Sequence, residues 1–281
     1  MSFVFFGRGG LLSSIVLSEL CRQGYAPKLV IIEEKKETNY PNLLTRVCAD
    51  NGLELVKTDN PNSTAIENIL EITRPDFCVV AGFATILKSN ILRVCKFYNI
   101  HPGLLPKYRG ADPIFWAVRN NEDVFGVTCH EMTEQIDVGN HMLSRETDLT
   151  QAIDSCQLFS SVYRSCGNVA VELVKSYRLG TKLVNLENKK IIENHYYPKP
   201  KIEDFQINPK WDVNFMYKFS NRVQMRGKPW FGLSTGKIYV SRANILYCPH
   251  LGKRTDNYEI KKVSDSSYII ENDTGVIELV G

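Results

Sequence analysis

The chain has 281 residues, and 43% of them are hydrophobic, which is enough to bury a core larger than that of one average domain. The formal net charge is only +3, from 34 Lys+Arg against 31 Asp+Glu, so the charge balance does not by itself indicate nucleic-acid binding. Near the amino end, the apolar run Phe3–Phe6 is followed by Gly7 and Arg8 and is too short for a signal peptide or a membrane-spanning helix. We therefore expect a cytoplasmic protein with no membrane partner.

In chain order, the first two thirds alternate short apolar runs with stretches of helical periodicity. The predicted strands are Phe3–Phe6, Leu29–Ile32, Leu53–Val56, Phe77–Val80 and Phe97–Ile100, and the predicted helices between them are Leu11–Cys21, Pro41–Asn51 and Thr64–Thr73. Apolar residues at steps of three and four from Phe159 to Tyr177 predict a longer helix that ends at Gly180. The pattern predicts an α/β fold with a Rossmann-like, mostly parallel sheet and helices on both faces.

After residue 195 the pattern changes. Prolines at positions 198 and 200 favour an extended linker over residues 196–202. A predicted helix at Val213–Asn221 is followed by short β runs, namely Lys237–Ser241, Ile245–Tyr247, Glu259–Val263, Tyr268–Glu271 and Val276–Val280. We predict a first domain of residues 1–195, a linker of residues 196–202, and a small C-terminal β-barrel (OB-like) domain of residues 203–281.

Eight cysteines lie scattered along the chain, with no Cys-x-x-Cys pair among them. We interpret them as reduced thiols that are mostly buried as small apolar residues. Cys248 and His250 could supply two metal ligands, but a structural zinc site needs four and no partner pair is visible. The sequence therefore predicts no metal site.

The segment Gly7-Arg-Gly-Gly-Leu-Leu-Ser13 joins the first predicted strand to the first predicted helix. Its backbone amides and the helix dipole can receive a phosphate, and an ordinary strand-to-helix turn is an equal alternative. The dinucleotide-binding fingerprint has a third glycine at the position of Leu12, so this segment departs from it. Glu33 or Glu34 could still take the place of its ribose-binding acid. A NAD-dependent Rossmann oxidoreductase is therefore an alternative enzyme class.

The densest group of unusual residues is Tyr98-Asn-Ile-His-Pro-Gly-Leu-Leu-Pro-Lys-Tyr-Arg-Gly110, at the carboxyl end of a predicted strand. Ligands bind at such ends in parallel sheets. Asn99 and His101 are two residues apart, so in a strand both side chains lie on the same face. Acyl transfer to an amine needs a donor for the oxyanion and a base for the amine's proton, and Asn99 and His101 meet these needs. Asp137 is our candidate for the carboxylate that orients the imidazole.

This loop, with Gly126-Val-Thr-Cys-His130 and Asp137-x-Gly139 after it, resembles the N10-formyltetrahydrofolate-dependent formyltransferases. The resemblance implies that Asn99, His101 and Asp137 are catalytic, that residues 1–195 form the formyltransferase domain, and that N10-formyltetrahydrofolate is the co-substrate. Two segments similar to the folate-binding ones imply a set of cofactor-binding residues: Phe83, Thr85, Ile86, Leu87, Met132, Thr133, Glu134 and Gln135. We expect backbone atoms of these segments to contact the pterin.

The resemblance also implies residues that would bind the acceptor. Expected substrate-binding residues are Gly9, Gly10 and Leu11, facing a phosphate, with Lys107, Tyr108 and Arg109 in the second loop. For Arg109 a solvated loop position is an alternative, and His130 either lines the site or packs across strands. No sequence pattern indicates an oligomeric state.

The methionyl-tRNA branch of the resembled family carries a long basic loop after the second strand, whereas the stretch Glu33–Pro41 here is short and has no net positive charge. The chain also lacks that branch's lysine-bearing closing segment. We therefore expect a small amine acceptor, first of all an amino sugar on a nucleotide, with methionyl-tRNA as the alternative. Basic and aromatic residues of the tail leave a nucleic-acid module as a further alternative, namely Lys253, Arg254, Lys261, Lys262, Trp211, Trp230, Phe231 and Tyr239.

Overall fold

The computed structural model describes residues 1–34, 42–181, 196–248 and 256–281. They form two compact units. The first comprises residues 1–110, 125–147 and 161–196, and the second comprises residues 111–124, 148–160 and 197–281, apart from the stretches that the structure does not describe. Two segments that we expected within a domain of residues 1–195, residues 111–124 and 148–160, thus pack with the second unit.

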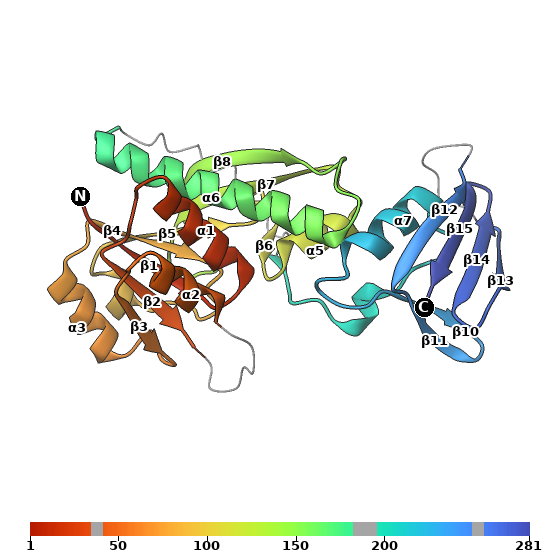
Figure 1. The fold of residues 1–281 in the computed structure, drawn as a ribbon, viewed down its shortest axis with the longest axis horizontal. Coiled ribbons are helices and arrows are strands. Elements are labelled where there is room, and N and C mark those ends of the chain that lie inside the picture. Colours follow the sequence, from red (N-terminus) through yellow and green to blue (C-terminus); the bar gives the residue numbers. More distant parts are fainter. Residues whose placement is uncertain (35–41, 182–195, 249–255) are drawn as a thin grey trace. The chain divides into compact units, whose positions relative to one another are not determined.

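The first unit is built on a seven-stranded sheet with the order β3-β2-β1-β4-β5-β7-β8 (Figure 1). Its strands are β1 (Phe3–Arg8), β2 (Leu29–Glu33), β3 (Leu55–Thr58), β4 (Phe77–Ala81), β5 (Lys96–His101), β7 (Val124–Glu131) and β8 (His141–Asp148). Strands β1 to β5 pair in parallel, and β7 pairs with β5 in the antiparallel sense. The mostly parallel sheet predicted from the sequence is confirmed.

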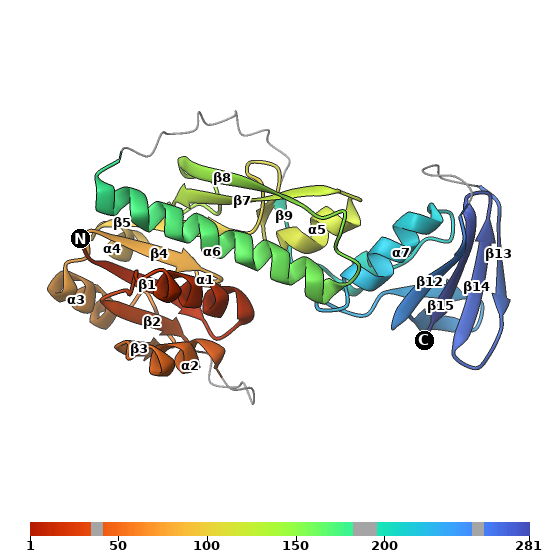
Figure 2. The ribbon, with the colours of Figure 1, turned by 45° about the horizontal axis from the view of Figure 1, so that its top comes forward.

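Helices cover both faces of this sheet (Figure 2). They are α1 (Leu11–Arg22), α2 (Leu43–Asp50), α3 (Thr64–Thr73), α4 (Ser89–Leu92) and α6 (Ser155–Leu179). On one face, Tyr177 of α6 stacks on Phe77 of β4 with ring centroids 4.1 Å apart. On the other face, Leu70 of α3 joins a buried cluster with Val4 and Cys78. Because successive strand residues point to opposite faces, the apolar run of each strand fills both layers.

Helix α6 ends as the sequence predicts. Gly180 adopts a positive φ of 63°, a conformation that favours glycine, and its amide donates to the Tyr177 carbonyl. The helix begins at Ser155, four residues before the predicted start at Phe159. Among all helices of the described residues, none is long and apolar enough to cross a membrane.

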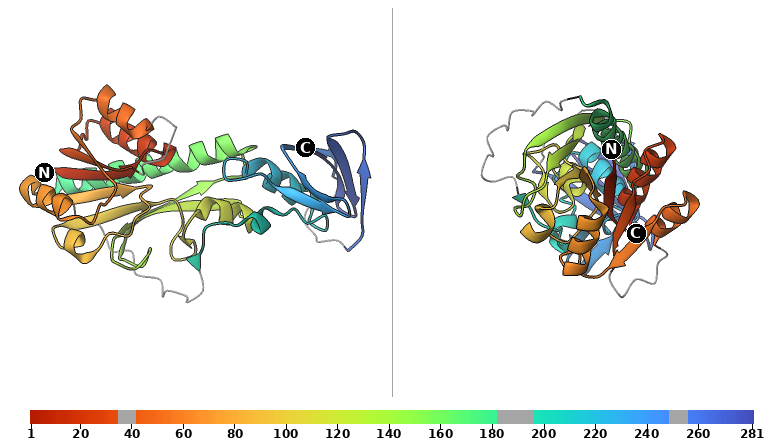
Figure 3. Two further views of the ribbon diagram at one scale, coloured as in Figure 1. Left: turned by 90° about the horizontal axis from the view of Figure 1, so that it is seen from below. Right: turned by 90° about the vertical axis from the view of Figure 1, so that its left-hand side faces the viewer.

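The second unit contains a four-stranded antiparallel sheet with the order β12-β15-β14-β13 and a β10-β11 hairpin (Figure 3). Its strands are β10 (Trp230–Leu233), β11 (Gly236–Tyr239), β12 (Arg242–Tyr247), β13 (Tyr258–Lys262), β14 (Ser267–Asn272) and β15 (Gly275–Val280). These strands confirm a small C-terminal β-rich part, although β10 was not predicted as a strand.

Three shorter helices complete the second unit: α5 (Pro113–Arg119), the 3-10 helix η1 (Ile202–Phe205) and α7 (Val213–Arg222). Two strands of two residues each, β6 (Arg109–Gly110) and β9 (Tyr196–Tyr197), lie near the ends of the first unit's segments. The Arg119 guanidinium of α5 lies 4.5 Å from the Trp211 ring. The buried Arg222 of α7 donates to the carbonyls of Ala152 and Leu149. These contacts explain why residues 111–124 and 148–160 belong to this unit.

Candidate active site

The carboxyl end of β5 brings Asn99 and His101 to one face of the sheet, as their spacing predicts. Strand β7 runs antiparallel beside it, so Asn99 lies opposite His130 and His101 lies opposite Thr128. Asn99 Nδ2 is 3.2 Å from His130 Nε2. His130 therefore belongs to this group of polar side chains rather than to an apolar packing layer.

Asp137 reaches the same point from the segment between β7 and β8. Its φ of 54° is left-handed, a conformation that Asp and Asn tolerate better than most residues. The Gly110 amide donates to Asp137 Oδ2 at 2.9 Å. The Arg109 guanidinium donates to the carbonyl of Ile136, the preceding residue, at 3.0 Å and 3.3 Å. Arg109 thus holds the backbone of the Asp137 turn.

The Asp137 carboxylate lies between two imidazoles. Its Oδ2 is 3.6 Å from His101 Nδ1, and its Oδ1 is 3.3 Å from His130 Nε2. All three side chains are buried, with relative exposures of 9%, 4% and 2% for Asp137, His101 and His130. The distance to His101 is that of an ion pair, longer than a direct hydrogen bond.

The backbone carbonyl of Tyr108 sets the tautomer of His101. His101 Nε2 is 2.6 Å from this oxygen, and because a carbonyl only accepts, Nε2 carries the proton. In a neutral imidazole the lone pair then lies on Nδ1, the atom that faces Asp137. The proton-accepting atom of His101 is therefore held beside a carboxylate.

His130 has its own orientation. Its Nδ1 lies 3.1 Å from the Glu131 carbonyl and therefore donates to it. Its Nε2 faces both Asn99 and Asp137. In a neutral ring this nitrogen carries no proton, so it accepts a hydrogen bond from the Asn99 amide. A protonated ring would instead donate to Asp137. In the neutral form, the second N–H of the Asn99 amide stays available for another acceptor.

The buried position sets the charges of the site. Burial lowers the pKa of His101, and the nearby Asp137 carboxylate offsets part of that effect. Burial also raises the pKa of Asp137, but the two histidines and the Gly110 amide lower it further, so the pKa of Asp137 falls below its usual range. At neutral pH the site holds an ionised carboxylate beside a neutral imidazole.

The loop between His101 and Arg109 is fastened from β7. The Thr128 hydroxyl donates to the Gly103 carbonyl at 2.8 Å and accepts from the Leu105 amide at 3.0 Å. The Leu105–Pro106 peptide bond is cis. Among the residues expected to bind substrate here, Tyr108 is buried and offers its carbonyl to His101, whereas Lys107 is exposed.

The two segments expected to bind folate meet on one core cluster. Phe83 and Met132 pack against it, and Leu87 is fully buried within it, so Leu87 contributes to the core of this region. Ile86 is half exposed. The Met132 amide donates to the Phe97 carbonyl of β5 at 2.8 Å.

Side chains around these segments hold them in place. Glu134 accepts from the Ser89 amide at 2.6 Å, and the Thr133 hydroxyl donates to the Gln135 carbonyl.

The buried Glu33 accepts from the Ala84 amide at 3.1 Å and from the Thr85 hydroxyl at 2.5 Å. From the sequence, Glu33 is only a possible substitute for a ribose-binding acid, whereas in the structure it holds the segment from Phe83 to Leu87.

The loop after β1 lies beside the same strand ends. Ser13 Oγ donates to the Ala81 carbonyl at 2.7 Å and accepts from the Arg8 amide. Gly9 packs so closely on Asn42 that a methyl group there would lie 2.7 Å from it. Gly10 precedes α1 as its N-cap, and Leu11 is exposed. Phosphate binding by Gly9, Gly10 and Leu11 stays a prediction.

No group of three or more metal-ligating side chains occurs within residues 1–34, 42–181, 196–248 and 256–281. His250, the second residue of the candidate pair with Cys248, lies outside the described residues. All eight cysteines are free.

A family model described as formyl transferase matches residues 19–173, more than half of the chain. The chain belongs to the formyl transferase family. The matched range contains Asn99, His101, His130 and Asp137, so the cluster lies inside the region that defines the family.

Two relatives are methionyl-tRNA formyltransferases. The one from Thermotoga neapolitana is 31% identical over 172 residues, 60% of this chain and 54% of that protein. The one from Chlorobium limicola is 26% identical over 233 residues, 81% of this chain and 72% of that protein. The first alignment thus spans about half the length of the relative.

Among solved structures, the N-formyltransferase from Helicobacter canadensis, in complex with folinic acid and dTDP-3-aminofucose, superposes with a TM-score of 0.71 at 15% identity. The superposition covers 100% of this chain and 99% of that one. This likeness confirms the fold.

Substitution of Gly103 tests the hydrogen bond that fixes the His101 tautomer. A methyl group at Gly103 would lie 2.6 Å from His101 Nε2 and 2.9 Å from the Tyr108 carbonyl. We expect Gly103→Ala to lower the free energy of unfolding by about 1–3 kcal/mol. Gly232→Ala is the control, since its methyl group would meet only Trp230 at 3.9 Å. The measurement is urea unfolding monitored by circular dichroism. Equal midpoints for the two variants would contradict the expectation.

Proposed function

We propose that this protein transfers a formyl group from N10-formyltetrahydrofolate to a primary amine. The observation that supports the proposal is the group formed by half-buried Asn99 with buried His101 and Asp137 at the carboxyl end of β5, in a chain of the formyl transferase family. The fastened segments around Phe83 and Met132 lie beside it and offer a partly apolar surface to a pterin ring. An NAD-dependent oxidoreductase is disfavoured, because Glu33 is engaged by Ala84 and Thr85.

The folate supplies the formyl carbon to the attacking amine. As the carbonyl becomes tetrahedral, the free N–H of the Asn99 amide donates to the developing oxyanion. His101 Nδ1 accepts the proton that the amine loses, and the adjacent Asp137 carboxylate stabilises the resulting imidazolium. The same proton then passes to the folate nitrogen as its bond to the formyl carbon breaks. The products are a formamide and tetrahydrofolate.

For the acceptor we propose an amino sugar linked to a nucleotide. The stretch Glu33–Pro41 carries three glutamates and two lysines, which is unsuited to an RNA backbone. The Helicobacter canadensis enzyme, which is similar over its whole length, was solved with dTDP-3-aminofucose. Methionyl-tRNA is the second candidate, since the relatives from Thermotoga neapolitana and Chlorobium limicola are methionyl-tRNA formyltransferases.

The second unit adds support for a small acceptor. Trp230 donates its indole N–H to the Ile202 carbonyl, and Trp211 lies against Arg119. Lys261 is paired with Glu259 and Glu271, and Lys262 with Asp265. These aromatic and basic side chains are therefore engaged within the unit. Lys253 and Arg254 lie outside the described residues.

The decisive experiment supplies the donor with a panel of acceptors. The full chain is incubated with N10-formyltetrahydrofolate and nucleotide-linked amino sugars, and in parallel with methionyl-tRNA. We expect one amino sugar to gain the mass of a single formyl group. Formylation of methionyl-tRNA alone would overturn the acceptor proposal, and no formyl transfer in either arm, with no binding of 5-formyltetrahydrofolate in calorimetry, would overturn the proposed chemistry.

Variants of the three side chains test their separate roles. We expect His101→Ala to lower kcat by about 10²–10⁴-fold and Asn99→Ala by about 10²–10³-fold with little change in folate affinity. At position 137, Asn is the informative replacement, because it tolerates the left-handed backbone that Ala resists. Near-native turnover of His101→Ala, with an unchanged circular dichroism spectrum, would show that another group is the base.

The pH dependence of kcat follows from the pKa of His101. Since burial lowers this pKa, the neutral form that accepts a proton persists below the ordinary value of about 6.5. We expect kcat to fall only as the pH drops through that lowered pKa. In Asp137→Asn the carboxylate that raises the pKa of His101 is lost, so the acid limb should move to lower pH. A limb that moves upward, or stays in place, would contradict the assignment.

A further inference from the structure

Two cysteines meet at the amino ends of β4 and β5. Cys78 lies on β4 and is fully buried, and Cys95 directly precedes β5 and is partly exposed. Their sulfur atoms are 3.5 Å apart. Cys78 is the register partner of Phe97, and Cys95 lies two residues before Phe97, so both thiols face the same layer of the core.

We propose that Cys78 and Cys95 form a reversible disulfide when the protein meets a hydroperoxide. The sulfurs need to approach by only about 1.5 Å to reach the length of a disulfide bond. This pair plays no part in the proposed formyl transfer, and it lies at the ends of β4 and β5 opposite to Asn99 and His101.

The two thiols have different roles in the reaction. Burial raises the pKa of Cys78 well above its usual value, whereas the hydrogen bond from Cys78 lowers the pKa of Cys95. The Cys95 thiolate therefore attacks the peroxide oxygen, which gives a sulfenic acid and releases hydroxide. Cys78 then attacks this sulfur, the disulfide forms, and water leaves. Two thiols and one hydrogen peroxide thus give one disulfide and two waters.

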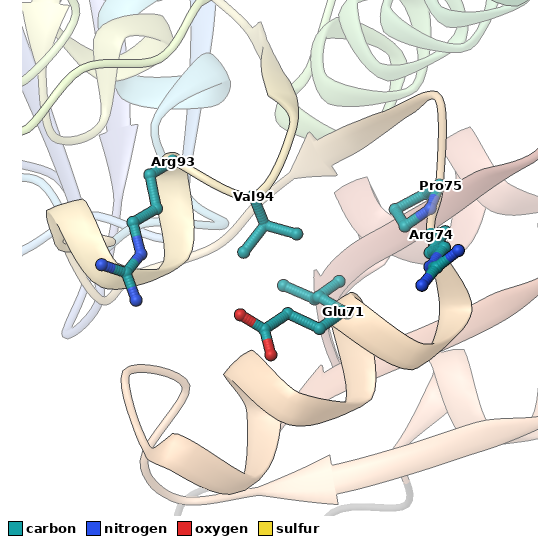
Figure 4. A pocket seen from close by; sticks show the side chains of 6 residues that line it. Glu71, Arg74, Pro75, Arg93 and Val94 are labelled. Carbon is teal, nitrogen blue, oxygen red and sulfur yellow. The ribbon is translucent and has the colours of Figure 1, made fainter.

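A cavity lies next to Val94, the residue before Cys95. It has a volume of about 620 Å³ and is lined by Val94 together with Leu70, Glu71, Arg74, Pro75 and Arg93. Figure 4 shows Val94 facing the last turns of α3 across this cavity. Glu71, Arg74 and Arg93 are exposed, so the cavity meets solvent.

A disulfide between Cys78 and Cys95 would close a loop that contains one of the segments expected to bind folate. The loop of residues 79–94 contains the whole segment from Phe83 to Leu87 and helix α4. A covalent link between its ends restricts the conformations open to the loop. The oxidised protein should therefore hold the segment that Glu33 fastens more firmly than the reduced protein does.

Cys21 and Cys48 provide a matched control pair. They lie on the contacting helices α1 and α2, and burial, with a smaller contribution from Cys21, raises the pKa of Cys48 to about 11. Burial also raises the pKa of Cys21. Neither thiol has the thiolate character of Cys95, so this pair should resist the same oxidant.

Peptide mapping of the full chain tests the proposal. Cys156→Ser serves as the background, because Cys156 is exposed and could join two molecules. After hydrogen peroxide treatment, trypsin cuts after Lys88 and Arg93 and places Cys78 and Cys95 in separate peptides. We expect these peptides to be joined, to separate on reduction with dithiothreitol, and to form at least tenfold more than a Cys21–Cys48 link.

A second variant separates the two chemical steps. In Cys78→Ser the sulfenic acid on Cys95 has no resolving thiol, so a dimedone adduct on Cys95 should rise at least tenfold over the background protein. Cys21→Ser should leave the yield of the Cys78–Cys95 link unchanged. A background protein that accumulates dimedone adducts or sulfinic acid on Cys95 without the link, or that forms the Cys21–Cys48 link as fast, would overturn the proposal.

Discussion

The buried charge of Asp137 is the constraint on which the candidate site depends. A carboxylate removed from water is costly unless hydrogen bonds and opposite charge compensate it. The Gly110 amide donates to Asp137, and the His130 and His101 rings, from two other segments, lie beside it, where a protonated ring would be stabilised. Thr128 fastens the loop after β5, and Arg109 fastens the Asp137 turn. The loop and the β5-β7 pair therefore depend on one another.

In the same arrangement, a different oxygen lies at each nitrogen of the His101 ring. In the familiar Ser-His-Asp arrangement the carboxylate accepts the Nδ1 proton of the histidine. Here the Tyr108 carbonyl takes the Nε2 proton, and the carboxylate faces the free Nδ1 at 3.6 Å. A neutral imidazole beside a fixed negative charge is a base whose protonated form is stabilised where it arises. Gly103 makes this possible, because any side chain there would meet the His101 ring.

The parallel sheet separates two kinds of chemistry along the same strands. The carboxyl ends of β4 and β5 carry the polar site and the segment held by Glu33, and the amino ends bring Cys78 and Cys95 together. Parallel pairing causes this separation, since it places all carboxyl ends at one edge. The loop of residues 79–94 connects the two ends. Oxidation of Cys78 and Cys95 at the amino ends would therefore act on the carboxyl ends through the backbone of this loop, although the two sites have no side chain in common.

Apolar periodicity was sufficient to predict β1, β2, β4 and β5, because these strands are buried on both faces, and it also predicted α1, α2 and α3, but it missed the short helix α4. It missed β7, although Phe125, Val127 and Cys129 alternate there with Gly126, Thr128 and His130, because no continuous apolar run marks this strand. It displaced β3 by two residues, since that edge strand is only partly buried. Contacts, not sequence order, assign residues 111–124 and 148–160 to the second unit.

The sequence by itself determined the residue types of the site, the shared face of Asn99 and His101, and the family resemblance that singled out Asp137. Only the tertiary structure decided that His130 lies beside Asn99, that the Tyr108 carbonyl orients His101, and that Glu33 holds the segment after β4. The physical reason is that strand spacing is local and fixed by the backbone. Antiparallel register and long-range hydrogen bonds, by contrast, exist only once distant segments have packed together.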